Sequence, residues 1–158
     1  MSTMSFDQLV LVTPRDPKVL RRERTKQAAS GAMDVMERCV IVPTLAEALE
    51  GVEIKCGTGM PTDMSIERKV AQEFAEPRRY FARILENDGD TGTTNDSIES
   101  IAFVFGNEKF GMTQEDMALC DVMLGIPTNP SFGSLNLASA VQLIAYDWRQ
   151  ALGGFESD

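Results

Sequence analysis

Three glycine-containing turns hold the residues whose types and spacing suit the binding of a small molecule. The turns are CGTGM (56–60), FGNEKFG (105–111) and GIPTNPSFGSLN (125–136), each at the end of an apolar run typical of a strand. Glycine and proline allow backbone N–H and C=O groups to come close to a ligand. Ile126 and Leu135 would add apolar walls, and the start of the last predicted helix would add N–H donors at Leu135 and Asn136. The pattern favours a flat heterocycle recognised through backbone edges.

Several mechanisms are excluded by what the sequence lacks. Histidine is absent from the 158 residues, which removes Ser–His and Cys–His nucleophilic mechanisms within one chain and the commonest zinc ligand. Neither G-x-G-x-x-G nor a P-loop pattern occurs, so pyrophosphate binding is not indicated. Cys39, Cys56 and Cys120 lie far apart without a Cys-x-x-Cys pair. This spacing predicts reduced thiols packed as small hydrophobes, and no metal site.

The charge pattern separates the chain into an acidic majority and two basic clusters. The formal net charge is −9, which should repel nucleic acid over most of the surface. The clusters are PRDPKVLRRERTK, with Arg15, Lys18, Arg21, Arg22, Arg24 and Lys26, and EPRRYFARI, with Arg78, Arg79 and Arg83. Each is either a solvated helix face or a surface that accepts a phosphate backbone. No apolar run reaches the length of a membrane span and no signal segment opens the chain, which predicts a cytoplasmic protein without a membrane partner.

The elements that must position the three turns alternate between strand and helix patterns. Strands are expected at 7–13, 39–42, 52–58, 101–106 and 122–127, and helices at 21–36 (with a break near Gly31), 44–51, 77–87, 114–119 and 135–152. The expected N-caps are Thr44 for the helix at 44–51, Thr113 for the helix at 114–119 and Ser134 for the helix at 135–152. The alternation predicts one α/β domain over 1–158 with a mostly parallel sheet and a mobile acidic loop at 87–100.

At two of the turns the sequence resembles a known family. FVFGNEKFGMT, followed by DVMLGIPTNPSFGSLNLASAVQLIAYDWR, closely resembles the second and third motifs of the SpoU/TrmH class of SPOUT RNA methyltransferases, in the TrmJ-like branch. The order and spacing of G-N-E-x-x-G, I-P and S-L-N-L-A-x-A make this match specific. Weaker similarity extends it to about residues 7–152.

The resemblance implies a fold, a cofactor and a substrate. It implies an α/β knot, in which the C-terminal segment forms a trefoil knot whose loops cradle S-adenosylmethionine at a homodimer interface, and 2′-O-methylation of tRNA or rRNA. By position, the cofactor-binding residues would be Thr58, Gly59, Met60, Gly106, Ile126, Ser134, Leu135 and Asn136. Glu108 matches the carboxylate near the reaction centre, and Asn136 joins it as a catalytic residue.

One family feature has no counterpart in these residues. Members of the family open with a further strand and helix that carry an N-x-G-x-x-A-R motif, whose arginine is assigned to activating the ribose hydroxyl. No such pattern occurs in the sequence, which is therefore expected to lack the first strand, the first helix and that arginine. An active methyltransferase and an inactive cofactor-binding or dimerisation module that retains the knot both remain open. A general metabolite-binding α/β protein would explain the turns but not their combined sequence.

Overall fold

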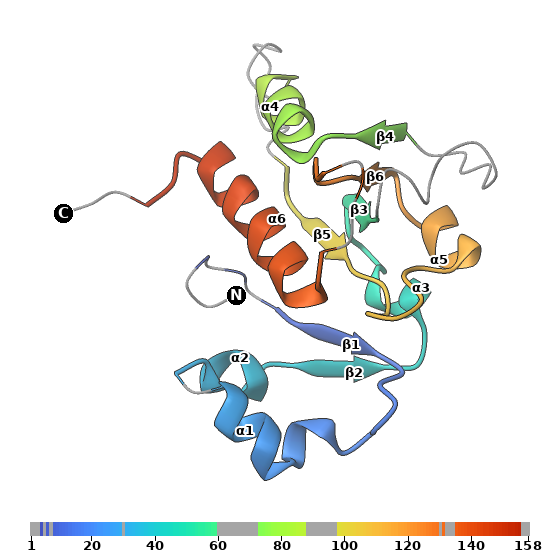
Figure 1. The fold of residues 1–158 in the computed structure, drawn as a ribbon, viewed down its shortest axis with the longest axis vertical. Coiled ribbons are helices and arrows are strands. Elements are labelled where there is room, and N and C mark those ends of the chain that lie inside the picture. Colours follow the sequence, from blue (N-terminus) through green and yellow to red (C-terminus); the bar gives the residue numbers. More distant parts are fainter. Residues whose placement is uncertain are drawn as a thin grey trace. The chain divides into compact units, whose positions relative to one another are not determined.

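The computed structural model describes residues 4, 6, 8–29, 31–59, 73–87, 98–129, 131 and 135–155. The chain forms two compact units, residues 1–50 (unit 1) and residues 51–158 (unit 2). Figure 1 shows the elements of both units along the chain. None of the helices in the described ranges is long and apolar enough to cross a membrane.

Unit 1 is a parallel strand pair joined by helical turns. Strand β1 (Val10–Val12) pairs in parallel with β2 (Val40–Val42), with Val10 opposite Val40. The connection contains the 3-10 turn η2 (Val19–Arg21), α1 (Glu23–Ala29) and α2 (Met33–Glu37), so the helix expected over 21–36 is divided on either side of Gly31 as predicted. The short helix α3 (Leu45–Ala48) follows, and its predicted cap is confirmed because Thr44 Oγ1 accepts a hydrogen bond from Glu47 N.

Unit 2 is built on a four-stranded sheet whose described pairings are all parallel. Its strand order is β4-β6-β3-β5, formed by β4 (Glu73–Ala75), β6 (Val122–Leu124), β3 (Ile54–Thr58) and β5 (Ile101–Val104). Strand β4 was not expected from the sequence. It is only three residues long and lies at the edge of the sheet, where Phe74 pairs with Met123.

The core of unit 2 is an aromatic cluster between the sheet and two helices. Helices α4 (Pro77–Asn87) and α6 (Leu137–Ala151) pack together, as Figure 1 shows. Phe81 of α4 is completely buried, and its ring lies 5.2 Å from that of Trp148 and 5.7 Å from that of Phe103, centroid to centroid. Ile144 and Trp148 are buried four residues apart on α6 because side chains at this spacing share one helix face. Phe81 and these α6 side chains therefore anchor both helices to the sheet.

The α/β class and the parallel sheet agree with the prediction, and two local expectations were wrong. Helix α6 begins at Leu137 with Asn136 as its N-cap, where Ser134 and a start at residue 135 were expected. The side-chain amide oxygen of Asn136 accepts from Ser139 N and so takes the capping position. Residues 88–97 of the expected mobile loop lie outside the described residues. The trefoil knot and the single-domain organisation stay predictions.

Candidate functional site

The carboxyl ends of three neighbouring parallel strands bring the predicted turns together. Strand β3 lies between β5 and β6, so the chain leaves all three strands at the same edge of the sheet. Thr58 Oγ1 donates a hydrogen bond to Val104 O at 2.9 Å, and Gly59 N donates one to Leu124 O at 3.1 Å. These two bonds join the first turn to the strands that lead into the second and third turns. This edge is the strand-end site, where open α/β sheets bind ligands.

The second turn is a closed backbone loop. Asn107 N donates to Gly111 O at 3.0 Å, Gly111 N donates back to Asn107 O at 2.7 Å, and the Asn107 side chain accepts from Lys109 N. Gly111 has a φ of 67°, a region that L residues rarely adopt. A Cβ on Gly106 would collide with the backbone of Gly111 and Met112. Glycine at position 106 therefore permits the close approach that shapes this loop.

A carboxylate links the second turn to the helix after the third turn. Glu108 Oε1 accepts a hydrogen bond from Leu137 N at 3.3 Å, and Asn136 Oδ1 accepts one from Ser139 N at 2.8 Å. The two side chains predicted as catalytic are thus brought together at the N-terminus of α6. The expected N–H donors at Leu135 and Asn136 lie before the first turn of α6, because the helix begins two residues later than expected. Asn136 caps the N-terminus of α6 through its side-chain oxygen.

The other predicted binding residues lie around this edge or outside the described part. Ile126, two residues after β6, is half-buried, and Leu135, just before α6, keeps 37% of its surface exposed. Both remain accessible enough to contact a ligand. Met60 and Ser134 lie outside the described residues. The binding role of every residue in this set stays a prediction.

Two features of the strand-end site were missed from the sequence. Phe110 is 74% exposed, and the Lys109 ammonium lies 5.0 Å from its ring centroid. The closed loop of the second turn carries both side chains. The only sequence signal was an aromatic residue within a polar stretch between two glycines. The Glu108–Leu137 bond had no sequence signal, because its partner is a backbone amide 29 residues away.

An apolar cluster and two buried thiols, Cys56 of β3 and Cys120 just before β6, belong to the core of unit 2. Met112, Met117, Cys120 and Met123 form one buried cluster. Gly57 fits against this cluster, since a Cβ there would lie 2.5 Å from Met123 Sδ. Burial raises the pKa of Cys56 to about 12 and that of Cys120 to about 11. Cys56 and Cys120 are packed as the sequence predicted, as small buried side chains, whereas Cys39 is only half-buried. The raised pKa values keep the two buried thiols protonated near neutral pH.

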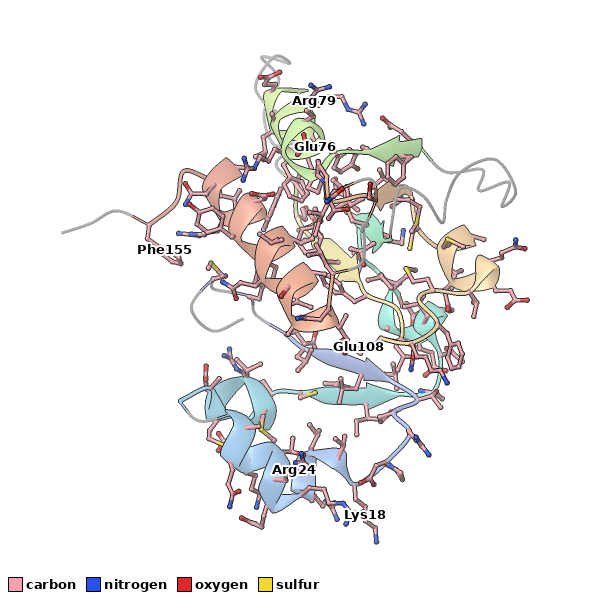
Figure 2. All side chains as sticks on the ribbon, viewed as in Figure 1. Lys18, Arg24, Glu76, Arg79, Glu108 and Phe155 are labelled. Carbon is pink, nitrogen blue, oxygen red and sulfur yellow. The ribbon has the colours of Figure 1, made fainter. Side chains whose placement is uncertain are left out.

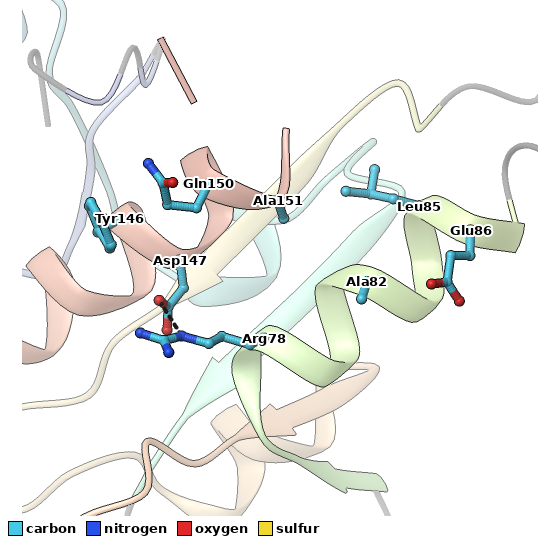
Figure 3. A pocket seen from close by; sticks show the side chains of 8 residues that line it. All are labelled: Arg78, Ala82, Leu85, Glu86, Tyr146, Asp147, Gln150 and Ala151. Carbon is cyan, nitrogen blue, oxygen red and sulfur yellow. Dashed lines mark hydrogen bonds and ion pairs between the residues drawn. The ribbon is translucent and has the colours of Figure 1, made fainter. Parts of the chain in front are cut away.

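An open groove of about 640 Å³ lies elsewhere, between α4 and α6 (Figure 3). Arg78 Nε donates to Asp147 Oδ1 across it at 2.9 Å. The groove is lined by Arg78, Ala82, Leu85, Glu86, Tyr146, Asp147, Gln150 and Ala151. Its α6 residues belong to the second half of that helix, whereas Glu108 contacts the first turn. The groove is therefore separate from the strand-end site.

Among the described residues, no group of three or more Cys, Asp or Glu side chains is placed to hold a metal ion.

Comparison with known proteins gives one consistent result. The family model described as the SpoU rRNA Methylase family matches residues 1–146. The chain is 35% identical over 151 residues to the tRNA (cytidine/uridine/adenosine-2′-O-)-methyltransferase TrmJ of Pseudomonas aeruginosa, a match that covers 96% of this chain and 53% of that protein. The chain spans about half the length of the curated relatives that it matches.

Solved structures agree with the family match. A probable methyltransferase from Bordetella pertussis superposes with a TM-score of 0.77 at 34% identity, covering 96% of this chain and 83% of that one. TrmJ from Z. mobilis superposes with a TM-score of 0.74 at 32% identity, covering 94% of this chain and 58% of that one. Sequence and structure therefore point to the same group of proteins.

Proposed function

The chain belongs to the SpoU rRNA methylase family, and we propose from this membership that it forms part of an S-adenosylmethionine-dependent methyltransferase acting on the ribose 2′-hydroxyl of tRNA or rRNA. The observation that carries the proposal is the joining of all three predicted turns. Thr58 bonds to the end of β5, Gly59 bonds to the end of β6, and Glu108 bonds to the first turn of α6. We propose a cytoplasmic location on the same ground, because the relatives are named as tRNA methyltransferases.

The residues at the strand-end site fit the cofactor. Gly59 and Gly106 place backbone groups without side chains at the ends of β3 and β5, while Gly125, at the end of β6, is buried against the ring of Phe74. Ile126 and Leu135 offer partly exposed apolar surface for a flat adenine ring. Thr58, Met60 and Ser134 complete the proposed binding set, together with Asn136. S-adenosylmethionine would supply the activated methyl group.

The ribose would be oriented by the two side chains at the start of α6. Glu108 Oε1 is engaged by Leu137 N, while its second oxygen makes no hydrogen bond within the described part of the chain. That oxygen would accept a hydrogen bond from the 2′-hydroxyl and align it for attack. The Asn136 side-chain NH₂ likewise has no described partner and would donate to the substrate. Phe110 would offer the adjoining base a surface for stacking.

Among the 158 residues, no motif of the family is matched that would remove the proton from the ribose hydroxyl. Positioned acid–base help typically contributes about 10²- to 10⁴-fold in rate. The family's N-x-G-x-x-A-R pattern does not occur in the 158 residues. A second candidate function is therefore retained. In this alternative, the polypeptide binds the cofactor or a second copy without efficient methyl transfer.

One experiment separates the two candidates. The 158-residue polypeptide is titrated with S-adenosylmethionine by calorimetry and assayed for methyl transfer to an unmodified tRNA transcript. A second form carries the N-terminal strand and helix of a TrmJ relative. Cofactor binding by both forms, with methyl transfer much faster in the extended form, supports the methyltransferase. Cofactor binding without transfer by either form supports the binding module, and no binding by either folded form contradicts the proposal.

We also propose that the chain forms a homodimer through α6. Ile144 and Trp148 of α6 are buried within unit 2. The large apolar side chains that remain exposed on this helix are Leu143, 38% exposed, and Tyr146, 46% exposed. These two side chains are available to a second copy.

A further inference from the structure

The two basic clusters of the sequence differ in how their charges are partnered. The described ranges contain thirteen lysines and arginines. Seven of these lie within 4.0 Å of a carboxylate oxygen, namely Arg22, Lys26, Arg38, Lys55, Arg78, Arg79 and Arg83. Lys109 and Arg149 lie over aromatic rings instead. The remaining four are Arg15, Lys18, Arg21 and Arg24, which have neither kind of partner within the described part of the chain.

These four cations all belong to residues 15–24, the basic segment, and all four are exposed. Figure 2 marks Lys18 and Arg24 on this part of unit 1. Residues 15–26 contain six basic and two acidic side chains, a formal charge of +4 in a chain of −9. The positive charge of unit 1 is therefore concentrated in one short stretch.

Local hydrogen bonds hold the basic segment in a defined shape. Asp16 accepts hydrogen bonds from Lys18 N at 2.9 Å and from Arg22 Nε at 2.8 Å. Its backbone oxygen accepts from Val19 N at the start of η2. Asp16 thus ties the turn together and neutralises Arg22, while the four unpartnered cations remain directed to solvent. None of the residues of η2 or α1 is buried.

Each arginine of the second cluster, Arg78, Arg79 and Arg83 on α4, lies beside a carboxylate. Arg83 makes two bonds to Glu73, at 2.6 and 2.8 Å, and Arg78 bonds to Asp147 at 2.9 Å. Arg79 lies 3.9 Å from Glu76, the residue just before α4. Figure 2 labels both residues. An arginine already paired with a carboxylate has to give up that partner before it contacts a phosphate. This cluster is therefore a poor site for RNA.

We propose that the basic segment is the surface through which this chain binds the phosphate backbone of its RNA substrate, and that the second arginine cluster is not. This inference rests on the proposed function, because it names the part of the chain that holds the RNA. Phosphate contacts position a nucleic acid and supply salt-dependent affinity without reading sequence. Outside residues 15–26 the chain is acidic, which disfavours phosphate contacts over most of the remaining surface.

The test compares two variants that lose the same charge. R15A/R21A/R24A removes three unpartnered arginines, and R78A/R79A/R83A removes three paired ones. Binding of a fluorescent unmodified tRNA transcript is measured by anisotropy between about 50 and 200 mM salt, because each lost phosphate contact lowers the slope of log affinity against log salt by about 0.7–0.9. We expect the first variant to lose at least about tenfold in affinity and about two units of slope. The second variant should keep a slope within about one unit of the wild type.

Further measurements keep the outcome unambiguous. R15K/R21K/R24K retains the charge and should retain most of the affinity, and circular dichroism must show all variants folded. Equal losses in the two alanine variants would overturn the inference, because net charge alone would then explain binding. Preferential binding of the segment to anionic lipid vesicles, with no change in RNA affinity, would also overturn it. Cofactor binding by calorimetry reports separately on the proposed function, since R15A/R21A/R24A leaves the strand-end site unchanged.

Discussion

Glu108 accepts a hydrogen bond from the backbone N–H of Leu137, so one carboxylate joins the second turn to the first turn of the last helix. The negative charge lies where the helix dipole is positive and where amides lack intrahelical partners. The same residue is the proposed ligand of the ribose hydroxyl. Structural and chemical roles therefore meet in one side chain, and they can be separated experimentally.

Replacement of Glu108 should affect stability and methyl transfer to different extents. Glu108→Ala removes the acceptor and the charge and should lower the free energy of unfolding by about 1 kcal/mol. Glu108→Gln keeps an acceptor and should cost about half of that. Both should slow methyl transfer by the extended form about a hundredfold or more. Urea unfolding and transfer assays measure the two effects, and Glu99→Ala, at an exposed loop position, is the control. Full transfer activity in Glu108→Gln would contradict the proposed role.

Replacement of Gly106 by alanine should impair cofactor binding. The new Cβ would meet the backbone of Gly111 and Met112, which cannot move aside as a flexible side chain would. The closed loop must then shift away from the first and third turns. Calorimetry with S-adenosylmethionine should show at least about a tenfold weaker affinity, or about 1.4 kcal/mol. Gly31→Ala is the matched control, because nothing lies within 4 Å of its added Cβ. Equal affinity in the two variants would show that the loop does not contribute.

Truncation of Phe81 should destabilise unit 2. This fully buried ring contacts Tyr80, Phe103 and Trp148 edge to face. Phe81→Ala should cost about 3–5 kcal/mol through lost burial and the cavity that remains. Trp148 is the only tryptophan, so its fluorescence during urea unfolding reports on this core. Phe110→Ala removes a ring that is 74% exposed and should change stability by less than about 0.5 kcal/mol.

The buried thiols predict a loss of stability at alkaline pH. Burial raises the pKa of Cys56 from 9.0 to about 12 and that of Cys120 from 9.0 to about 11. The folded state therefore holds more protons than the unfolded state above pH 9, and the free energy of unfolding falls as the pH rises through this window. Urea midpoints measured on either side of pH 9 should show the decrease, and Cys56→Ala should make it smaller. An equally steep decrease in Cys56→Ala would exclude this thiol as a cause.

The proposed dimer should depend on the outward face of α6. Wild-type protein is expected to be dimeric by light scattering at micromolar concentration. Leu143→Glu together with Tyr146→Glu places two charges on the apolar surface and should give a monomer, because charge is costly to bury in an interface. Gln142→Glu adds charge at an exposed polar position of the same helix and should leave the dimer intact. A wild-type monomer would contradict the proposal.

The amino-acid sequence determined the features that depend on neighbouring residues. Threonine three residues before an acidic side chain predicted the caps of α3 and of α5 (Gln114–Ala118), and the capping box of Thr113 and Asp116 is present. Apolar runs followed by glycine turns predicted β3, β5 and β6 and the shared edge at which their turns begin. Each of these signals lies within a few residues of the feature that it predicts.

Only the tertiary structure decided the features that depend on distant residues. Strand β4 forms because Glu73–Ala75 meets β6, about fifty residues later in the chain. Two arginine-rich stretches look alike in sequence. Folding nevertheless places Glu73 and Asp147 beside Arg83 and Arg78, whereas no carboxylate in the described ranges lies beside Arg15 or Arg24. Glu108 acquires its role only when Leu137 N–H arrives from α6. Charge partners and long-range hydrogen bonds act within a few ångströms in space, so their identity is set by packing rather than by sequence spacing.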